Sequence, residues 1–310
     1  MKNSSSITVG IPKAMLYYRY NVLWETFFHE LGIQTTDSGP TSQKILKNGA
    51  ALAADEACLS LKLFLGHVNE LVGACDYILI PRISNFGRNR NMCVRFEALY
   101  DLSRNVFRGT GQKFLTYNVD AFAGQDEAVA FVRLGQSLGF SAKTAKKAYD
   151  TAEKAERRAW KERVRAEEQL YKSDGPKILI SAHSYLIEDP YVGKPVTDCL
   201  KKLGAVPIRA DLIDRDAALK RSPELSPTCK WEVSRELIGS ISLHQKKVDG
   251  IILLSAFPCG PDAMVNELLT KRLKGVPLLS LVLDEQSGIA GIETRLESFV
   301  DIIQLKRGNL

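Results

Sequence analysis

Residues 250–269 read GIILLSAFPCGPDAMVNELL, and this stretch contains the two signals that decide the fold. The apolar run at 250–254 has the length of a strand, and residues 262–274 repeat their apolar positions with the period of a helix. A strand without polar alternation is typical of a parallel sheet that is covered on both faces. Cys259 lies where the strand ends and the helix begins. The stretch therefore predicts one strand–helix unit of an α/β fold.

The same order of strand and helix recurs along the chain. Helical periodicity is evident at residues 23–31 and 61–72. Six further apolar runs have strand character: residues 7–11, 77–80, 113–117, 177–180, 205–208 and 276–283. This alternation predicts an α/β fold made of two flavodoxin-like or Rossmann-like doubly wound domains.

One long segment interrupts the alternation. Residues 141–172 contain neither Gly nor Pro and are rich in Ala, Glu, Lys and Arg, which predicts a long connecting helix with a solvated, mixed-charge face. We expect an N-terminal lobe over 1–150, a helical linker over 151–175 and a C-terminal lobe over 176–310. The last helix of the C-terminal lobe is expected to pack back on the first lobe.

Composition and missing motifs exclude several classes of function. The chain has 310 residues, 45% of them hydrophobic and 25% charged, with a net charge of only +6, and its basic residues are not interleaved with aromatics as in a nucleic-acid binder. It has no apolar run long enough to span a membrane, and the opening MKNSSS does not resemble a signal peptide. Phosphate-binding loops, the G-x-S-x-G elbow and H-E-x-x-H are absent. We therefore expect a cytoplasmic protein that does not itself hydrolyse nucleotides.

The six cysteines carry the strongest chemical signal. Cys58, Cys93 and Cys259 each stand where a helix is expected to begin, and two of them follow a predicted strand. Helix N-termini favour thiolates and anionic clusters, so these three thiols could bind metal. For each of the three taken alone, position favours packing in the core, and the chain has no C-x-x-C pair that would indicate a metal site. The remaining cysteines are expected to pack in the core or, for the last of them, to be a second-tier ligand: Cys75, Cys199 and Cys229.

Several segments together resemble a known family. The chain is similar to the 2-hydroxyacyl-CoA dehydratase-like iron–sulfur proteins, and within them to the branch related to acyl-CoA dehydratase activases. The resemblance runs from about residue 7 to residue 303. It rests on LYYRYNVLWETFFHELG (16–32), EACLSLKLFLGHV (56–68), DYILIPRI (76–83), SAHSYLIEDPYVGKPV (181–196), FPCGPDAM (257–264) and LDEQSGIAGIETRLESFVD (283–301).

The resemblance implies a cofactor, a function and a partner. It implies a [4Fe–4S] cluster held by Cys58, Cys93 and Cys259 between two flavodoxin-like domains, with one iron left open. Some relatives hold a double-cubane cluster, and a separate ATP-hydrolysing iron–sulfur activase supplies their electrons. We therefore expect an oxygen-sensitive protein for low-potential electron transfer or for reduction of a small molecule.

Two departures from the family pattern keep other functions open. Leu59 and Val94 follow the first two cysteines, where family members often have proline, and dehydratases pair two different subunits. A reductase-like, electron-transfer or accessory role is therefore favoured over an active dehydratase. The alternatives are a non-enzymatic metal- or ligand-binding accessory protein and a metal-free binder. A homodimer, in which two clusters would lie near one another, also stays open.

A second tier of residues is expected to line the pocket around the cluster. These side chains flank the cysteines in the sequence or follow predicted strands at their carboxyl ends, where open α/β sheets bind ligands. They are Glu56, His67, His183, Tyr185, Asp284 and Glu285.

Overall fold

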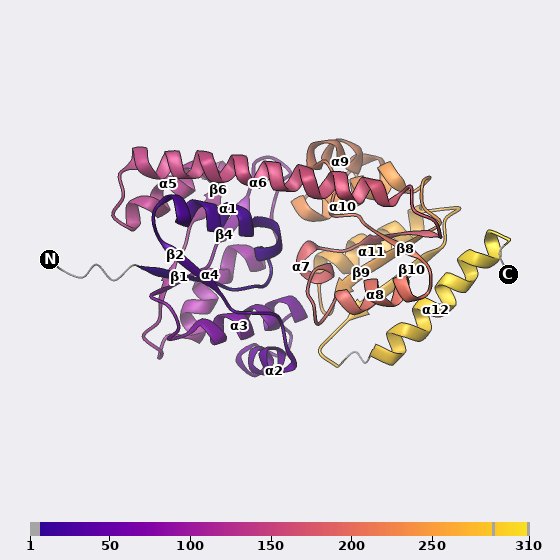
Figure 1. The fold of residues 1–310 in the computed structure, drawn as a ribbon, viewed down its shortest axis with the longest axis horizontal. Helices are drawn as coiled ribbons and strands as arrows, with labels where there is room; N and C mark the ends of the chain where they lie inside the picture. Colours follow the sequence, from indigo (N-terminus) through magenta and orange to yellow (C-terminus); the bar gives the residue numbers. More distant parts are fainter. Residues whose placement is uncertain (1–6, 287–288, 309–310) are drawn as a thin grey trace. The chain divides into compact units, whose positions relative to one another are not determined.

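The computed structural model describes residues 7–286 and 289–308, which form two compact units (Figure 1). The first unit contains the chain up to residue 55 and residues 61–159, and the second contains residues 56–60 and the chain from residue 160 onward. The opening MKNSSS and two residues of the 283–301 segment (287–288) lie outside the described residues. The lobe limits expected at 150 and 175, and the packing expected of the last helix, stay predictions.

The first unit is built on a parallel sheet with strand order β2-β1-β3-β5. Its buried aromatic core joins α1, β5–β6, α5 and α6: the Phe27 and Phe131 rings lie 4.9 Å apart, and Trp24 Nε1 donates to Tyr117 Oη at 2.9 Å. The elements are β1 (Thr8–Ile11), α1 (Tyr17–Glu30), β2 (Gln34–Asp37), α2 (Gln43–Leu52), α3 (Leu59–Leu71), β3 (Tyr77–Leu79), β4 (Arg82–Asn85), α4 (Val94–Val106), β5 (Lys113–Leu115), β6 (Asn118–Asp120), η1 (Ala121–Ala123), α5 (Glu127–Ser137) and α6 (Ala142–Leu170).

The second unit repeats this architecture with the order β10-β9-β7-β8, again all parallel. Helix α12 packs on α8, while α10 packs on α9 and α11. The elements are β7 (Lys177–Ser181), α7 (Ser184–Ile187), α8 (Lys194–Lys202), β8 (Val206–Arg209), α9 (Arg215–Arg221), η2 (Ser222–Glu224), α10 (Glu232–His244), β9 (Gly250–Ala256), α11 (Gly260–Arg272), β10 (Leu278–Leu283) and α12 (Ile289–Lys306). The predicted doubly wound α/β fold is confirmed.

Three strands were not expected from the sequence. Strand β2 is polar (QTTD) and forms the edge of the first sheet, so it lacks the apolar run that marks a buried strand. Strands β4 and β6 form a separate parallel pair that continues the β3–β5 ladder. Pro81 separates β3 from β4, because proline has no N–H to donate to the ladder.

Helix α6 is the predicted long helix, and it is unbroken over 29 residues (Figure 1). Its first part packs in the first unit, where Ala145 is fully buried and Tyr149 Oη donates to Glu127 at 2.9 Å. Its last part belongs to the second unit, where Trp160 Nε1 donates to the carbonyl oxygen of Ile213 at 3.0 Å. Helix propensity alone predicts this helix, but these contacts decide which of its faces is buried.

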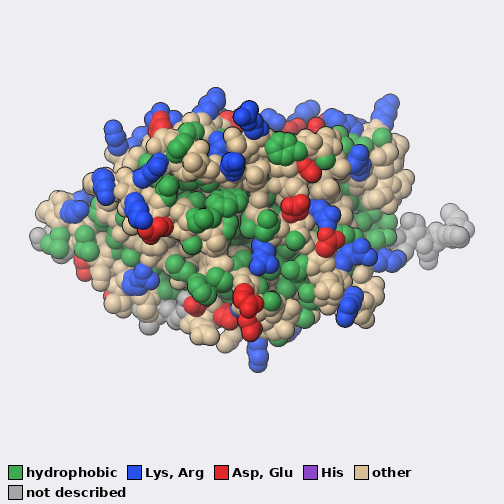
Figure 2. All heavy atoms as spheres, turned by 180° about the vertical axis from the view of Figure 1, so that it is seen from behind, with side chains coloured by type: hydrophobic (Ala, Val, Ile, Leu, Met, Phe, Trp, Pro, Cys, Tyr) green, Lys and Arg blue, Asp and Glu red, His purple; other side chains and the backbone are tan. Residues whose placement is uncertain are grey.

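The surface is of mixed charge. On the face that Figure 2 shows, Lys and Arg side chains are interspersed with Asp and Glu rather than gathered in one patch. Among the helices of residues 7–286 and 289–308, none combines the length and the apolar character that a membrane crossing requires.

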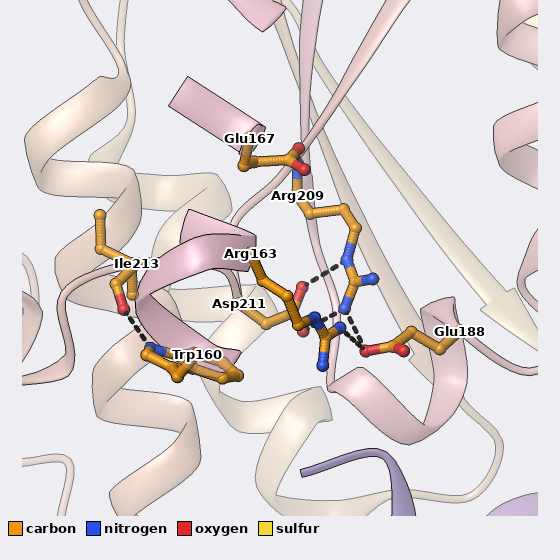
Figure 3. A network of polar contacts seen from close by, with 7 residues as sticks. All are labelled: Trp160, Arg163, Glu167, Glu188, Arg209, Asp211 and Ile213. Carbon is orange, nitrogen blue, oxygen red and sulfur yellow. Dashed lines mark hydrogen bonds and ion pairs between the residues drawn. The ribbon is translucent and has the colours of Figure 1, made fainter. Parts of the chain in front are cut away.

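A partly buried ion-pair network attaches α6 to the edge strand of the second sheet (Figure 3). The Arg209 guanidinium donates to Asp211 at 3.0 Å and to Glu188 at 2.6 Å, and Glu188 also pairs with Arg163 of α6. The Glu167 carboxylate accepts the backbone N–H of Arg209 at 2.6 Å. An edge strand exposes unpaired backbone N–H and C=O groups with which another chain could pair. Here Glu167 of α6 binds one of these N–H groups.

We predict that Arg209→Ala lowers the free energy of unfolding by about 3–5 kcal/mol, because it removes a cation from buried carboxylates. Arg157→Ala is the control, because Arg157 of α6 pairs with Glu153 at the surface. This substitution should lower the free energy of unfolding by about 0.5 kcal/mol or less. Urea denaturation of both variants measures the difference. Equal losses in the two variants would show that the network does not hold the helix.

Candidate functional site

The carboxyl edge of the second sheet has a topological switch point between β7 and β9. The chain leaves β7 toward β8 on one side and leaves β9 toward β10 on the other. Because crossovers between parallel strands are right-handed, α8 and α11 lie on opposite faces of the sheet. Ligands of open α/β sheets bind in the crevice that such a divergence creates.

Two side chains meet at this switch point from the segments that follow the two strands. His183 follows β7, Asp262 follows β9, and His183 Nε2 lies 2.8 Å from Asp262 Oδ1. Each side chain is only 9% exposed. The ring of Tyr185 stacks on that of His183 at 5.0 Å, so the pair has an aromatic wall.

The environment keeps the Asp262 carboxyl ionised. Burial by itself would raise the pKa of Asp262, but the charge and hydrogen bond of His183, together with a hydrogen bond to Cys259, hold that pKa below its ordinary value. His183 and Asp262 are therefore a buried imidazole–carboxylate pair within the second unit.

Cys259 is the N-cap residue of α11, and Asp262 is the third residue of that helix. Burial raises the pKa of the Cys259 thiol, and the charge of Asp262 raises it further. In the absence of a cation, the sulfur therefore carries its proton.

The structure brings Cys58 to the same place. Residues 56–60 belong to the second unit although the chain on both sides belongs to the first. The backbone N–H of Leu59 donates to the carbonyl oxygen of Phe257 at 2.9 Å, and Cys58 is close enough to contribute to the raised pKa of Cys259. Glu56 begins this short segment and is exposed.

The third predicted ligand lies in the first unit. Cys93 is the N-cap residue of α4, is partly buried, and follows the loop after β4. Within the part of the chain that the structure describes, no three His, Cys, Asp or Glu side chains lie together as a metal-binding group. Of the three predicted cysteines, Cys58 and Cys259 thus stand in two segments that are joined by the hydrogen bond from Leu59 to Phe257.

The remaining second-tier residues have other surroundings. Asp284 and Glu285 follow β10 at the carboxyl edge, as expected, but both are exposed. The Asp284 carboxylate accepts the backbone N–H of Gln286 at 2.8 Å, which orders the turn.

His67 is a buried residue of the first unit. Ser38 Oγ lies 2.7 Å from its Nδ1 and Thr41 Oγ1 lies 2.9 Å from its Nε2, so both ring nitrogens bind hydroxyl groups. Burial lowers the pKa of His67 to about 4. These contacts hold the loop after β2 against α3.

Sequence reasoning missed Asp262 as a site residue. Its place near the site could have been predicted, because it stands three residues after Cys259 in FPCGPDAM, at the expected start of a helix. Its partner His183 is remote in sequence, and only the parallel pairing of β7 with β9 brings the two together. Cys229 is also near: burial raises the pKa of its thiol, and the charge of Asp262 adds to this.

An open groove of about 510 Å³ adjoins Cys259 within the second unit. Its lining includes Phe257 and Cys259 from the segment after β9, Asn266, Glu267 and Thr270 of α11, and Val282 of β10. The volume is within the range of small-molecule pockets.

We predict that protonation of His67 destabilises the fold as the pH falls. The unfolded chain binds this proton with a pKa near 6.5 and the folded chain with a pKa of about 4, so stability decreases from pH 6.5 to pH 4 by up to about 3 kcal/mol. His67→Gln should remove this part of the pH dependence, as measured by urea denaturation across that range. His29→Gln, at an exposed histidine of α1, should retain it, and a His67→Gln profile parallel to the wild type would contradict the prediction.

One family model matches the chain. The family is described as the CoA enzyme activase uncharacterised domain (DUF2229), and the match covers residues 8–213. It includes Cys58, Cys93 and His183 and ends before Cys259. No curated protein matches the chain. Because the matched region is more than half of the 310 residues, the chain belongs to this CoA enzyme activase domain family.

Proposed function

We propose that this protein is an iron–sulfur protein of the 2-hydroxyacyl-CoA dehydratase-like class. Cys58, Cys93 and Cys259 would hold a [4Fe–4S] cluster, and the protein would transfer electrons at low potential or reduce a small molecule. Membership in a CoA enzyme activase family supports a role beside a CoA-dependent enzyme system.

The observation that carries the proposal is the association of Cys58 with Cys259. A five-residue segment from the first half of the chain, which contains Cys58, is part of the second unit, and its Leu59 donates a backbone hydrogen bond to Phe257, two residues before Cys259. This placement is expected if the two cysteines contribute to one ligand site.

The chemistry of the donor set fits iron and sulfide. Thiolates are the ligands that iron–sulfur clusters use, and Cys58, Cys93 and Cys259 each directly precede a helix. The free N–H groups at a helix start favour anionic sulfur. A cluster with three protein ligands would supply one open iron as Lewis acid and a path for single electrons.

The groove beside Cys259 favours reduction of a bound molecule over electron relay alone. Its walls combine apolar surface from Phe257 and Val282 with polar groups from Asn266 and Thr270. Such a lining suits a small organic molecule with an apolar body and a few polar atoms. The electron donor in this proposal is a separate ATP-hydrolysing iron–sulfur activase, since the chain has no nucleotide-binding loop.

We predict that wild-type protein reconstituted without oxygen contains about four irons per chain, or about eight for a double cubane. Cys58→Ser, Cys93→Ser and Cys259→Ser should each lose most of this iron while retaining the far-ultraviolet circular dichroism of the fold. Iron and sulfide analysis measures the loss.

Cys75→Ser is the matched control. Cys75 is a partly buried thiol of the first unit whose Sγ contacts the carbonyl oxygen of Leu71, and it is not among the proposed ligands. Its iron content should equal that of the wild type. Iron that is unchanged in all three ligand variants would refute the proposed cluster site.

A further inference from the structure

Basic side chains gather at the amino edge of the second sheet, although the surface as a whole is of mixed charge. Four segments end at this edge: the last turns of α8, α10 and α11 with their connections to β8, β9 and β10, and the end of α12. The Arg307 guanidinium pairs with Asp249, directly before β9, which places the end of α12 there. Asp249 is the one acidic residue of these segments, whereas their Lys and Arg residues, all exposed, are Lys201, Lys202, Lys246, Lys247, Lys271, Arg272, Lys274, Lys306 and Arg307.

Helix dipoles do not account for this charge. Lys and Arg stabilise the C-terminal end of a helix, so dipoles alone would make the amino edges of both sheets basic. In the first sheet, however, the corresponding ends of α1, α3 and α4 with their connections carry Arg104 and Arg108 against Glu30, Glu70 and Asp76. The same architecture therefore has a strongly basic amino edge in the second unit alone.

Most of this positive charge is not neutralised within the protein. Lys271 pairs with Glu267 and Arg307 pairs with Asp249. Within residues 7–286 and 289–308, no ion pair neutralises the other basic side chains of this edge. Like charges that share an edge repel one another, and an anionic partner relieves that repulsion.

The composition of the edge favours one class of anionic partner. Most of its basic residues are Lys, which is depleted in protein–protein interfaces. None of the four segments contains Phe, Trp or Tyr, on which the bases of single-stranded nucleic acids stack. An anionic lipid surface requires neither feature, because each Lys or Arg near it contributes through its charge.

The end of α12 adds apolar surface to this edge. Ile302 is 49% exposed and Leu305 is 60% exposed, and they stand three residues apart on the helix, directly before Lys306. Exposed aliphatic side chains beside basic ones are typical of helices that lie on a membrane surface.

We propose that the amino edge of the second sheet is a docking surface for an anionic lipid membrane. The basic side chains would face the headgroups, and Ile302 and Leu305 would enter the interface. This surface does not depend on a bound metal. Strand β9, with seven residues, separates it by about 20 Å from the carboxyl edge, so docking leaves the groove beside Cys259 open.

The test is co-sedimentation of the full-length protein with lipid vesicles. Wild-type protein should bind vesicles of mixed phosphatidylserine and phosphatidylcholine but not vesicles of phosphatidylcholine alone, and salt at about 1 M should release it. The triple variant Lys246→Glu, Lys247→Glu, Lys274→Glu should lower the partition coefficient by about a hundredfold, since each basic side chain near such a surface contributes about fivefold. The double variant Ile302→Asn, Leu305→Asn should also weaken binding, because it removes the apolar contact.

The matched control changes the net charge equally at another place. Lys143, Lys147 and Lys154 are exposed on α6 within the first unit, and their joint replacement by Glu should leave the partition coefficient within about twofold of the wild type. An equal loss in the two triple variants, or wild-type protein that does not bind the anionic vesicles, would overturn the proposal. So would tighter binding to duplex DNA than to these vesicles at the same salt concentration, which would assign the edge to nucleic acid.

Discussion

In both sheets every strand pairs in parallel with its neighbours, so each connection must return along a helix before the next strand begins. The carboxyl ends of the strands therefore share one edge, and each helix that follows a strand begins at that edge. The order β10-β9-β7-β8 adds a divergence between β7 and β9. Residues that are distant in sequence, such as His183 and Asp262, become neighbours for this reason alone.

The site in the second unit is a consequence of that edge. Cys259 lies between β9 and α11, and Asp262 lies in the first turn of α11. His183, in the segment after β7, contacts Asp262. The segment 56–60 joins them through the hydrogen bond from Leu59 to Phe257. The buried His183–Asp262 pair, the N-cap residue Cys259 and an adjoining groove thus lie at the edge where an open α/β sheet binds its ligands.

The sequence predicted the strands that are buried along their whole length, but not the strands that are partly exposed. The apolar runs that became β7 and β9 identified the α/β fold, since strands covered on both faces are continuously apolar over most of their length. The polar edge strand β2 and the short β4 and β6 had no such signal, because their pairing depends on strands elsewhere. Cys259 and His183 were readable as residues at strand ends, whereas the Asp262 partnership required the strand order. His67 shows the opposite case, in which a histidine suspected of function has both ring nitrogens bound to hydroxyls of a loop.

The most direct test of the central claim is a crystal structure of anaerobically reconstituted protein with an anomalous difference map at the iron absorption edge. We expect a compact iron peak in contact with the sulfurs of Cys58 and Cys259, close to Asp262, and with Cys93 as a third ligand. Iron bound elsewhere, or full reconstitution without any peak at these sulfurs, would contradict it.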